Sequence, residues 1–217
     1  MTHHLEADSI QLEFGDRKIL SGAYIQCQTG EIAGLLGRNG QGKSCLMQMV
    51  YGTLAGEKSV RIDKVAYPEA YKRPGLLLYL PQFNFIPKRL SLRRVFNDFE
   101  VDFFPFQQLF PEFASKFRAP IGSLSGGGQR LVELYVIAKS RALFTMLDEP
   151  FTHLSPLQIE KVKELLLQEK HSKGFLISDH MYRPVLDITD TVYVLVHGHT
   201  YKTKSLQDIE TMGYVSL

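Results

Sequence analysis

The sequence has 217 residues, of which 44% are hydrophobic and 22% are charged, and its formal net charge is +2. These values are ordinary for a globular protein with one domain, or one domain and a small subdomain. They give no general argument for nucleic-acid binding, and no apolar run approaches the roughly 20 residues that span a bilayer. Two cysteines, Cys27 and Cys45, are too few for a disulfide framework, and the N-terminus lacks a signal-peptide pattern. We therefore expect a cytosolic chain without a nucleic-acid partner, whose membrane role, if it has one, comes through another protein.

Strand patterns come first along the chain. Residues 9–14 and 23–27 alternate apolar and polar side chains, which predicts two half-exposed antiparallel strands. Residues 31–36 form a short apolar run that predicts a buried strand, and residues 45–51 have helical spacing that breaks at Gly52. The segment between this strand and this helix is the most informative part of the sequence.

That segment fits the phosphate-binding pattern G-x-x-x-x-G-K-S/T at every fixed position. Its glycines allow backbone N–H groups to surround an anion, and the following helix directs its positive end at the phosphates. Lys43 is expected to reach the β- and γ-phosphates, and the Ser44 hydroxyl to ligate Mg²⁺. We interpret Cys45, just after the loop, as a small packed side chain within the nucleotide-binding segment. The predicted nucleotide-binding loop consists of Gly37, Arg38, Asn39, Gly40, Gln41, Gly42, Lys43 and Ser44.

Further strands and helices alternate over the rest of the chain. Apolar runs predict strands at residues 76–80, 143–147, 175–178 and 192–196, and residues 157–168 have one apolar helical face after Pro156. This alternation predicts a mostly parallel sheet covered on both sides.

A phenylalanine-rich region interrupts this pattern. Ten of the 14 phenylalanines lie between residues 83 and 117, and prolines divide the region into short pieces. We predict a small helical subdomain over residues 83–124, inserted into the α/β core. Most of its rings are expected to fill a small core, and an exposed aromatic groove for a partner is the alternative. The ten residues are Phe83, Phe85, Phe96, Phe99, Phe103, Phe104, Phe106, Phe110, Phe113 and Phe117.

Two more motifs follow. Ser125-Gly126-Gly127-Gly128 opens a helical stretch, and the strand at residues 143–147 leads into Asp148 and Glu149. Phosphoryl transfer needs carboxylates at such a strand end, one for the Mg²⁺ shell and one to orient the attacking water.

In this order and spacing, the motifs resemble the ATP-binding cassette (ABC) ATPase family, and the match covers nearly the whole chain. The resemblance implies a single ABC ATPase domain over residues 1–217. Its expected fold is an α/β P-loop NTPase core with a mostly parallel sheet, an N-terminal antiparallel β-subdomain and the inserted helical subdomain.

The resemblance also implies roles for individual residues. Asp148 is the Mg²⁺-shell carboxylate and Glu149 the candidate general base. Gln82, in Leu80-Pro81-Gln82, would contact Mg²⁺ and the attacking water, and His180 would contact the γ-phosphate. Phe14 lies where the family places an aromatic ring against adenine. Ser125, Gly126 and Gly127 match the signature segment, which binds ATP.

The sequence departs from the family pattern in three places. Gly128 replaces the usual Gln or Glu of the signature, and Ser155 replaces the aspartate that normally ends the segment after Glu149. The interval from Gln82 to Ser125 is also short, which predicts a reduced helical subdomain. The Ser155 change bears on communication between paired sites, because the family uses that segment across a dimer.

The resemblance implies an ATP-hydrolysing subunit of an ABC transporter, with ATP and Mg²⁺ as cofactors. In the family, two cassettes close head-to-tail around two ATP molecules, and the membrane-spanning subunits are separate polypeptides. We therefore expect a second ABC ATPase subunit and polytopic membrane subunits as partners, and a cytoplasmic location on the inner face of the membrane.

Two alternatives remain at this stage. One is a soluble, non-transport ABC ATPase acting on nucleic acid, although the chain lacks the long heptad run and the second cassette of such proteins. The other is a nucleotide-gated interaction module without hydrolysis, which Gly128 and Ser155 leave open.

Overall fold

The computed structural model describes residues 1–203. Its central sheet has six strands in the order β10-β9-β3-β8-β7-β6, all parallel except the antiparallel edge strand β10. The strands are β3 (Ile32–Leu36), β6 (Leu77–Leu80), β7 (Phe144–Asp148), β8 (Gly174–Ser178), β9 (Thr191–Val196) and β10 (His199–Thr203).

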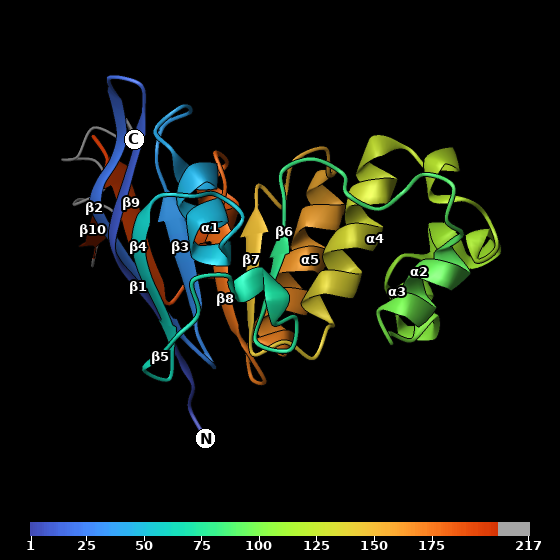
Figure 1. Cartoon of the computed structure of the whole chain (residues 1–217). Helices are drawn as coiled ribbons and strands as arrows, with labels where there is room; N and C mark the ends of the chain where they lie inside the picture. Colours follow the sequence, from blue (N-terminus) through green and yellow to red (C-terminus); the bar gives the residue numbers. More distant parts are fainter. Residues whose placement is uncertain (204–217) are drawn as a thin grey trace.

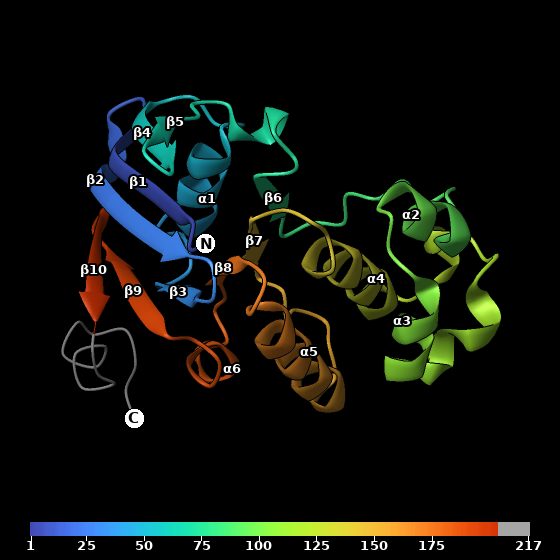
Figure 2. The same cartoon turned by 90° about the horizontal axis from the view of Figure 1, so that it is seen from below.

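A second, antiparallel sheet lies over one face of the central sheet, with helix α1 (Lys43–Tyr51) between the two (Figures 1 and 2). Its strand order is β2-β1-β4-β5. These strands are β1 (His4–Phe14), β2 (Arg17–Gln28), β4 (Glu57–Ile62) and β5 (Val65–Ala66). The short 3₁₀ helix η1 (Ala70–Lys72) leads back to the central sheet at β6.

Helices cover the opposite face. They are α4 (Gly126–Ala138), α5 (Pro156–Glu169) and α6 (Tyr182–Leu186). Figure 2 shows α5 and α6 on the side of the sheet away from α1. Within residues 1–203 no helix combines the length and the apolar character needed to cross a membrane.

Strand β3 shows why the sheet needs both layers. Ile32 and Leu36 belong to the hydrophobic core under α4, α5 and α6, whereas Ala33 and Leu35 belong to the core under α1 and the antiparallel sheet. All four side chains are fully buried, as expected for a parallel strand whose alternate residues face two covering layers. The expected fold class is therefore confirmed.

Residues between β6 and α4 form short helices that lie at one end of the molecule in both views (Figures 1 and 2). They are α2 (Leu92–Asp98), α3 (Phe103–Leu109), η2 (Pro111–Lys116) and η3 (Ile121–Ser123). Side-chain caps begin both α-helices, because Ser91 accepts from the Arg94 N–H and Asp102 from the Phe104 N–H.

The phenylalanines of this region mostly form its core. Phe106 is fully buried, with ring centroids 5.1 Å from Phe96 and 4.9 Å from both Phe113 and Tyr135. The rings therefore attach the short helices to α4. Phe103 and Phe106 are buried, so an exposed aromatic groove cannot include them, whereas Phe104 is 56% exposed. Phe83 and Phe85 are also exposed, and both lie nearer to β6.

The predicted strands and the helices flanking the phosphate loop and Pro156 are present, with ends that differ by a few residues. Strands β4, β5 and β10 were missed. β4 pairs with β1 although residues 59–61 carry Ser and Arg, so an apolar pattern could not reveal it. α1 begins at Lys43 rather than Cys45, because the left-handed backbone of Gly42 ends the loop there.

Replacing Phe106 by Ala should lower the free energy of unfolding by about 3–5 kcal/mol, because a fully buried ring leaves a cavity. The matched control Phe104→Ala, at an exposed ring of the same helix, should change it by only about 0.5 kcal/mol. Urea denaturation followed by circular dichroism measures both. Equal losses would contradict the assignment of Phe106 to the core.

Candidate nucleotide-binding and hydrolysis site

The predicted phosphate loop connects the carboxyl end of β3 to the start of α1. Gly42 has a φ of 101°, and a Cβ there would lie 2.8 Å from the Ile19 side chain, so the loop needs glycine at this position. Lys43 is buried, and its Nζ donates to the carbonyl of Gly37 at 2.7 Å. Burial lowers the pKa of Lys43, and the carboxylates of Glu149, Asp148 and Asp179 oppose that shift.

A cavity of about 490 Å³ adjoins this loop and joins segments far apart in the sequence. Phe14 ends β1 and Arg17 begins β2. Gln82 follows β6, and Glu149 and His180 follow β7 and β8. The carboxyl ends of parallel strands thus meet at one place, as in other open α/β sheets. Its lining consists of Phe14, Arg17, Ile19, Asn39, Gly40, Gly42, Lys43, Ser44, Cys45, Gln82, Glu149 and His180.

Three loop residues are not part of that lining. Gly37 lies beneath it, where a Cβ would come 3.0 Å from the Leu195 carbonyl. Gln41 borders a smaller neighbouring hollow and accepts the His197 N–H at 3.3 Å. Arg38 shapes the loop, because its carbonyl accepts the Gln41 N–H at 3.2 Å.

Asp148 is buried at the end of β7, and hydroxyl groups hold both of its oxygens. Tyr79 on β6 donates to Oδ2 at 2.9 Å, and Ser178 on β8 donates to Oδ1. The carboxylate is therefore fixed from the two neighbouring strands. Burial and the proximity of Asp148 raise the pKa of Tyr79, so this phenol remains a donor.

Glu149 follows directly, and its Oε2 faces two predicted site residues. Gln82 Nε2 donates to it at 2.8 Å, and His180 Nδ1 lies 3.4 Å from it. The hydroxyl of Thr152 is 3.5 Å from the same oxygen. Only 12% of the Glu149 side chain is exposed, so this carboxylate lies at the edge of the cavity rather than on the open surface.

The segment around His180 is tied to the segment after Glu149 through Asp179. This buried carboxylate accepts the Phe151 N–H at 3.2 Å and the Met181 N–H at 2.8 Å. Burial raises the pKa of Asp179, and the two backbone N–H groups oppose that shift.

The signature segment lies apart from this cavity. Ser125 caps α4 by accepting the Gly128 N–H at 3.2 Å, and Gly126 and Gly127 form the first turn of the helix. A Cβ at Gly127 would lie 2.4 Å from the His153 carbonyl, so this contact requires glycine. Within one chain, the structure does not bring Ser125, Gly126 or Gly127 to Lys43.

The two substituted positions among the three departures, Ser155 and Gly128, each have a local structural explanation. Ser155 is the N-cap of α5 and forms a capping box with Gln158, so the substitution preserves the start of that helix. Gly128 is buried beside Ser125 and Phe113, and a Cβ there would lie 3.2 Å from the Ser125 oxygen.

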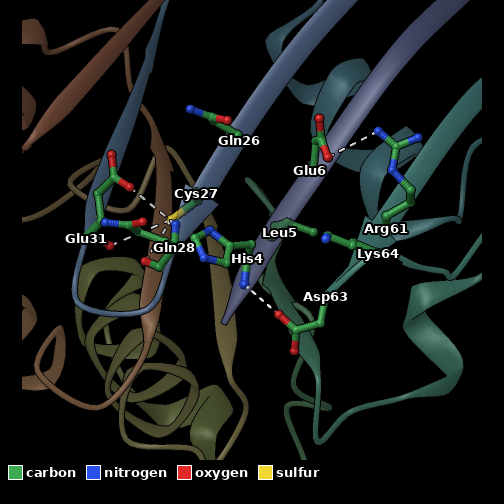
Figure 3. Close-up of a pocket in the computed structure, with 10 residues that line it drawn as sticks. All are labelled: His4, Leu5, Glu6, Gln26, Cys27, Gln28, Glu31, Arg61, Asp63 and Lys64. Carbon is green, nitrogen blue, oxygen red and sulfur yellow. Dashed lines mark hydrogen bonds and ion pairs between the residues drawn. The ribbon is translucent and has the colours of Figure 1, made fainter. Parts of the chain in front are cut away.

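A second hollow of about 480 Å³ lies on the antiparallel sheet and shares no lining residue with the nucleotide cavity (Figure 3). Its charged groups largely satisfy one another. Arg61 pairs with Glu6 at 3.2 Å, and Asp63 accepts the His4 N–H at 2.9 Å and pairs with His3 at 2.6 Å. The hollow contains none of the predicted site residues.

Sequence reasoning missed several residues around the cavity. Tyr79 and Ser178 hold Asp148, and Arg17 and Ile19 line the cavity. Arg130 on α4, which binds backbone carbonyls beside Gln82 and Glu149, was also missed. Only Ser178 and Tyr79 could have been found from the sequence, because Ser178 lies two residues before His180 and Tyr79 lies three residues before Gln82.

Replacing Lys43 by Ala should abolish ATP turnover, because the β/γ-phosphates lose the buried cation at the start of α1. The control Lys64→Ala, at an exposed residue of the turn between β4 and β5, should turn over ATP like the unmodified protein. Phosphate release measures both. Turnover by Lys43→Ala near the unmodified level would show that this loop is not the reacting phosphate site.

Comparisons with known proteins show which family the chain resembles over most of its length. The family described as ABC transporter matches residues 20–152. The Lipopolysaccharide export system ATP-binding protein LptB of Escherichia coli (strain K12) is 30% identical, over 94% of this chain and 93% of that protein. The protein of the same name from Haemophilus influenzae is 28% identical, over 94% and 92%.

Solved structures support the fold. A structure described as the ATP binding subunit of an ABC transporter superposes with a TM-score of 0.83 at 20% identity, covering 97% of this chain and 93% of that chain. The ADP-bound cassette MJ1267 gives a TM-score of 0.76 at 21% identity, covering 96% and 94%. The expectation of an ATP-hydrolysing transporter subunit is thereby confirmed: the chain belongs to the ABC transporter family, as one of its ATP-binding subunits.

Proposed function

We propose that this chain hydrolyses ATP in the cavity beside the phosphate loop and uses the reaction to power membrane subunits that are separate polypeptides. The observation that carries the proposal is the position of the Glu149 carboxylate, which lines the same cavity as Lys43 and Ser44. A carboxylate beside a phosphate-binding loop can act on the attacking water, whereas a site built only to bind ATP has no need of it.

The residues present fit a Mg²⁺ ion bound with the nucleotide. Ser44 and Gln82 line the cavity, Asp148 lies behind it, and all three offer the oxygen ligands that Mg²⁺ prefers. Because two hydroxyl groups occupy the Asp148 oxygens, we assign Asp148 to the outer shell of the ion. In the described residues, no cluster of three or more His, Cys, Asp and Glu side chains could hold another metal. When bound, Mg²⁺ would neutralise charge that develops on the phosphate oxygens.

Each residue around the cavity has a separate role in this proposal. Phe14, 53% exposed at the cavity, offers a ring to the adenine base, and the loop from Gly37 to Cys45 offers backbone N–H groups to the phosphates. Glu149 accepts a proton from the attacking water or orients it, and Gln82 and His180 position the water and the γ-phosphate. The present contact of Gln82 with Glu149 keeps both side chains close to where they are needed.

In this proposal, the ATP site is completed by a second cassette, which is either another copy of this chain or a different ABC ATPase subunit. Ser125, Gly126 and Gly127 lie on the outer turn of α4, away from the chain's own cavity, and Ser125 and Gly126 are exposed. They are therefore available to meet the γ-phosphate held by another cassette. Hydrolysis would remove that shared phosphate and allow the pair to open.

The membrane partner would bind where the segment after Gln82 meets the helices of residues 83–124, which we treat as an inserted subdomain. Exposed Phe83, Phe85 and Phe104 support a docking surface there. The relatives from two bacteria are named for lipopolysaccharide export and match this chain over more than nine-tenths of their own length. This similarity supports a transporter assembled from separate chains, with the cassette on the cytoplasmic face of the membrane.

Replacing Glu149 by Gln should lower ATP turnover at least about a hundredfold, because the amide cannot accept the proton. ATP should still bind through Lys43 and Ser44, so the closed pair should accumulate. Size-exclusion chromatography with ATP and Mg²⁺ should show this variant as a dimer and the unmodified protein mostly as a monomer.

The control for this test is Glu164→Gln, which makes the same change at an exposed position on α5 and should leave turnover and elution unchanged. A bulky residue added at Ser125 should prevent the Glu149→Gln dimer. A variant that binds ATP, stays monomeric and keeps turning over would contradict the role of Glu149. One that binds ATP and stays monomeric without turnover would point to a different cassette as partner.

Replacing Phe83 or Phe104 by Ser should leave ATP affinity unchanged and release the protein from membranes that contain its partner. Both rings are mostly exposed, and their burial against a partner would contribute roughly 1.5–3 kcal/mol each. Co-sedimentation with membranes, beside an ATP-binding assay, measures the two properties. Full retention of both variants would place the docking surface elsewhere.

A further inference from the structure

Arg130 is a buried cation in α4 that the reaction described above does not use. It is only 2% exposed, and α4 packs against β6 and β7, the strands that end beside Gln82 and Asp148 (Figures 1 and 2). A buried guanidinium is costly unless its N–H groups are bonded, so its partners show what it holds in place.

Three backbone carbonyls accept hydrogen bonds from this side chain. One terminal nitrogen donates to the carbonyl of Pro81 at 2.6 Å. The other donates to the carbonyl of Asp148 and, at 3.0 Å, to the carbonyl of Glu149. The planar fork of one guanidinium therefore joins the residue before Gln82 to Asp148 at the end of β7 and to Glu149 directly after it.

The backbone at Glu149 is strained, and the hydrogen bonds from Arg130 help to hold it in this conformation. Glu149 has a φ of 49°, a left-handed conformation that costs a residue with a Cβ about 1 kcal/mol or more. Its N–H donates to the Ser178 carbonyl at 2.7 Å, and its C=O accepts from Arg130. Both sides of the strained residue are thus held, and its side chain is directed toward Gln82 and His180.

Neighbouring residues of α4 hold the rest of the segment after β6. The fully buried Glu133 accepts the N–H groups of Phe85 and Ile86 at 2.9 and 3.0 Å, and Gln129 accepts from Asn84 at 3.0 Å. Burial lowers the pKa of Arg130, and the carboxylates of Glu133 and Asp148 oppose that shift. The guanidinium remains a cation, because arginine titrates far above neutral pH.

We propose that Arg130 is the positioning residue of the hydrolytic site: its bonds to the carbonyls of Pro81, Asp148 and Glu149 fix the separation of Gln82 from Glu149 and hold Glu149 in its left-handed backbone conformation. The inference rests on the proposed role of Glu149 in hydrolysis. It assigns Arg130 no contact with ATP, so loss of its bonds should affect the chemical step and spare nucleotide binding.

The test replaces Arg130 by Lys and by Gln. A lysine ammonium keeps the charge but lacks the rigid fork, and glutamine keeps an amide donor without the charge. For both variants kcat should fall about ten- to a hundredfold, because a displaced base costs rate even when it is present. The ATP dissociation constant and KM should stay within about twofold of the unmodified values. The matched control Arg141→Lys, at an arginine whose side chain is 88% exposed, should leave kcat unchanged.

A double-mutant cycle with Gln82→Ala tests whether Arg130 acts through the site. The effect of Arg130→Lys on kcat should be several-fold smaller once Gln82 is truncated, because the pair of residues that it aligns is then incomplete. Unchanged kcat in both Arg130 variants would overturn the inference. A loss of kcat accompanied by an equal loss of ATP affinity would also overturn it. The same holds if the fold-loss of kcat in the double variant equals the product of the fold-losses in Arg130→Lys and Gln82→Ala, because the two residues would then act independently.

The Glu149 and Arg130 variants distinguish a failure of the proposed function from a failure of the positioning role. If Glu149→Gln lacks turnover while both Arg130 variants turn over normally, only the positioning role fails. If Glu149→Gln itself turns over ATP, the proposed hydrolytic role of Glu149 fails and the Arg130 inference fails with it.

Discussion

The site depends on the compensation of buried charges at the carboxyl ends of β6, β7 and β8. Asp148 lies there without exposure and is held by the hydroxyl groups of Tyr79 and Ser178. Arg130 approaches the same strand ends from α4 and binds carbonyls on either side of the cavity. Buried ions are stable only with such partners, so Asp148, Arg130 and the groups bonded to them form a fixed frame around the cavity.

Other contacts in the cavity involve groups that the reaction requires. Lys43 is bonded to the Gly37 carbonyl at 2.7 Å, and Gln82 is bonded to Glu149 at 2.8 Å. In our proposal both side chains exchange these partners when ATP and Mg²⁺ bind, because the phosphates need the lysine and the ion needs the glutamine. The site thus combines a fixed frame with a small number of side chains that change partners.

The sequence predicted the central strands because their apolar runs reflect burial on both faces, as residues 32–36 illustrate. It also predicted most of the residues that line the cavity, though not Arg17 or Ile19, because the predicted motifs follow strands that end at one edge of the sheet. It missed β4 and Arg130 for the same physical reason: polar side chains were buried or paired by segments distant in the chain. It could not separate Phe106 from Phe104, because their exposure depends on how α3 packs against α4.

In our proposal, ATP enters a preformed site in which Arg130 keeps Glu149 and Gln82 aligned. A structure of the protein bound to Mg²⁺ and a non-hydrolysable ATP analogue tests it most directly. We expect Lys43 to leave the Gly37 carbonyl for the phosphates, while Arg130 keeps its contacts with the carbonyls of Pro81, Asp148 and Glu149. Phosphates bound away from Lys43, or an Arg130 side chain released from those carbonyls, would contradict the proposal.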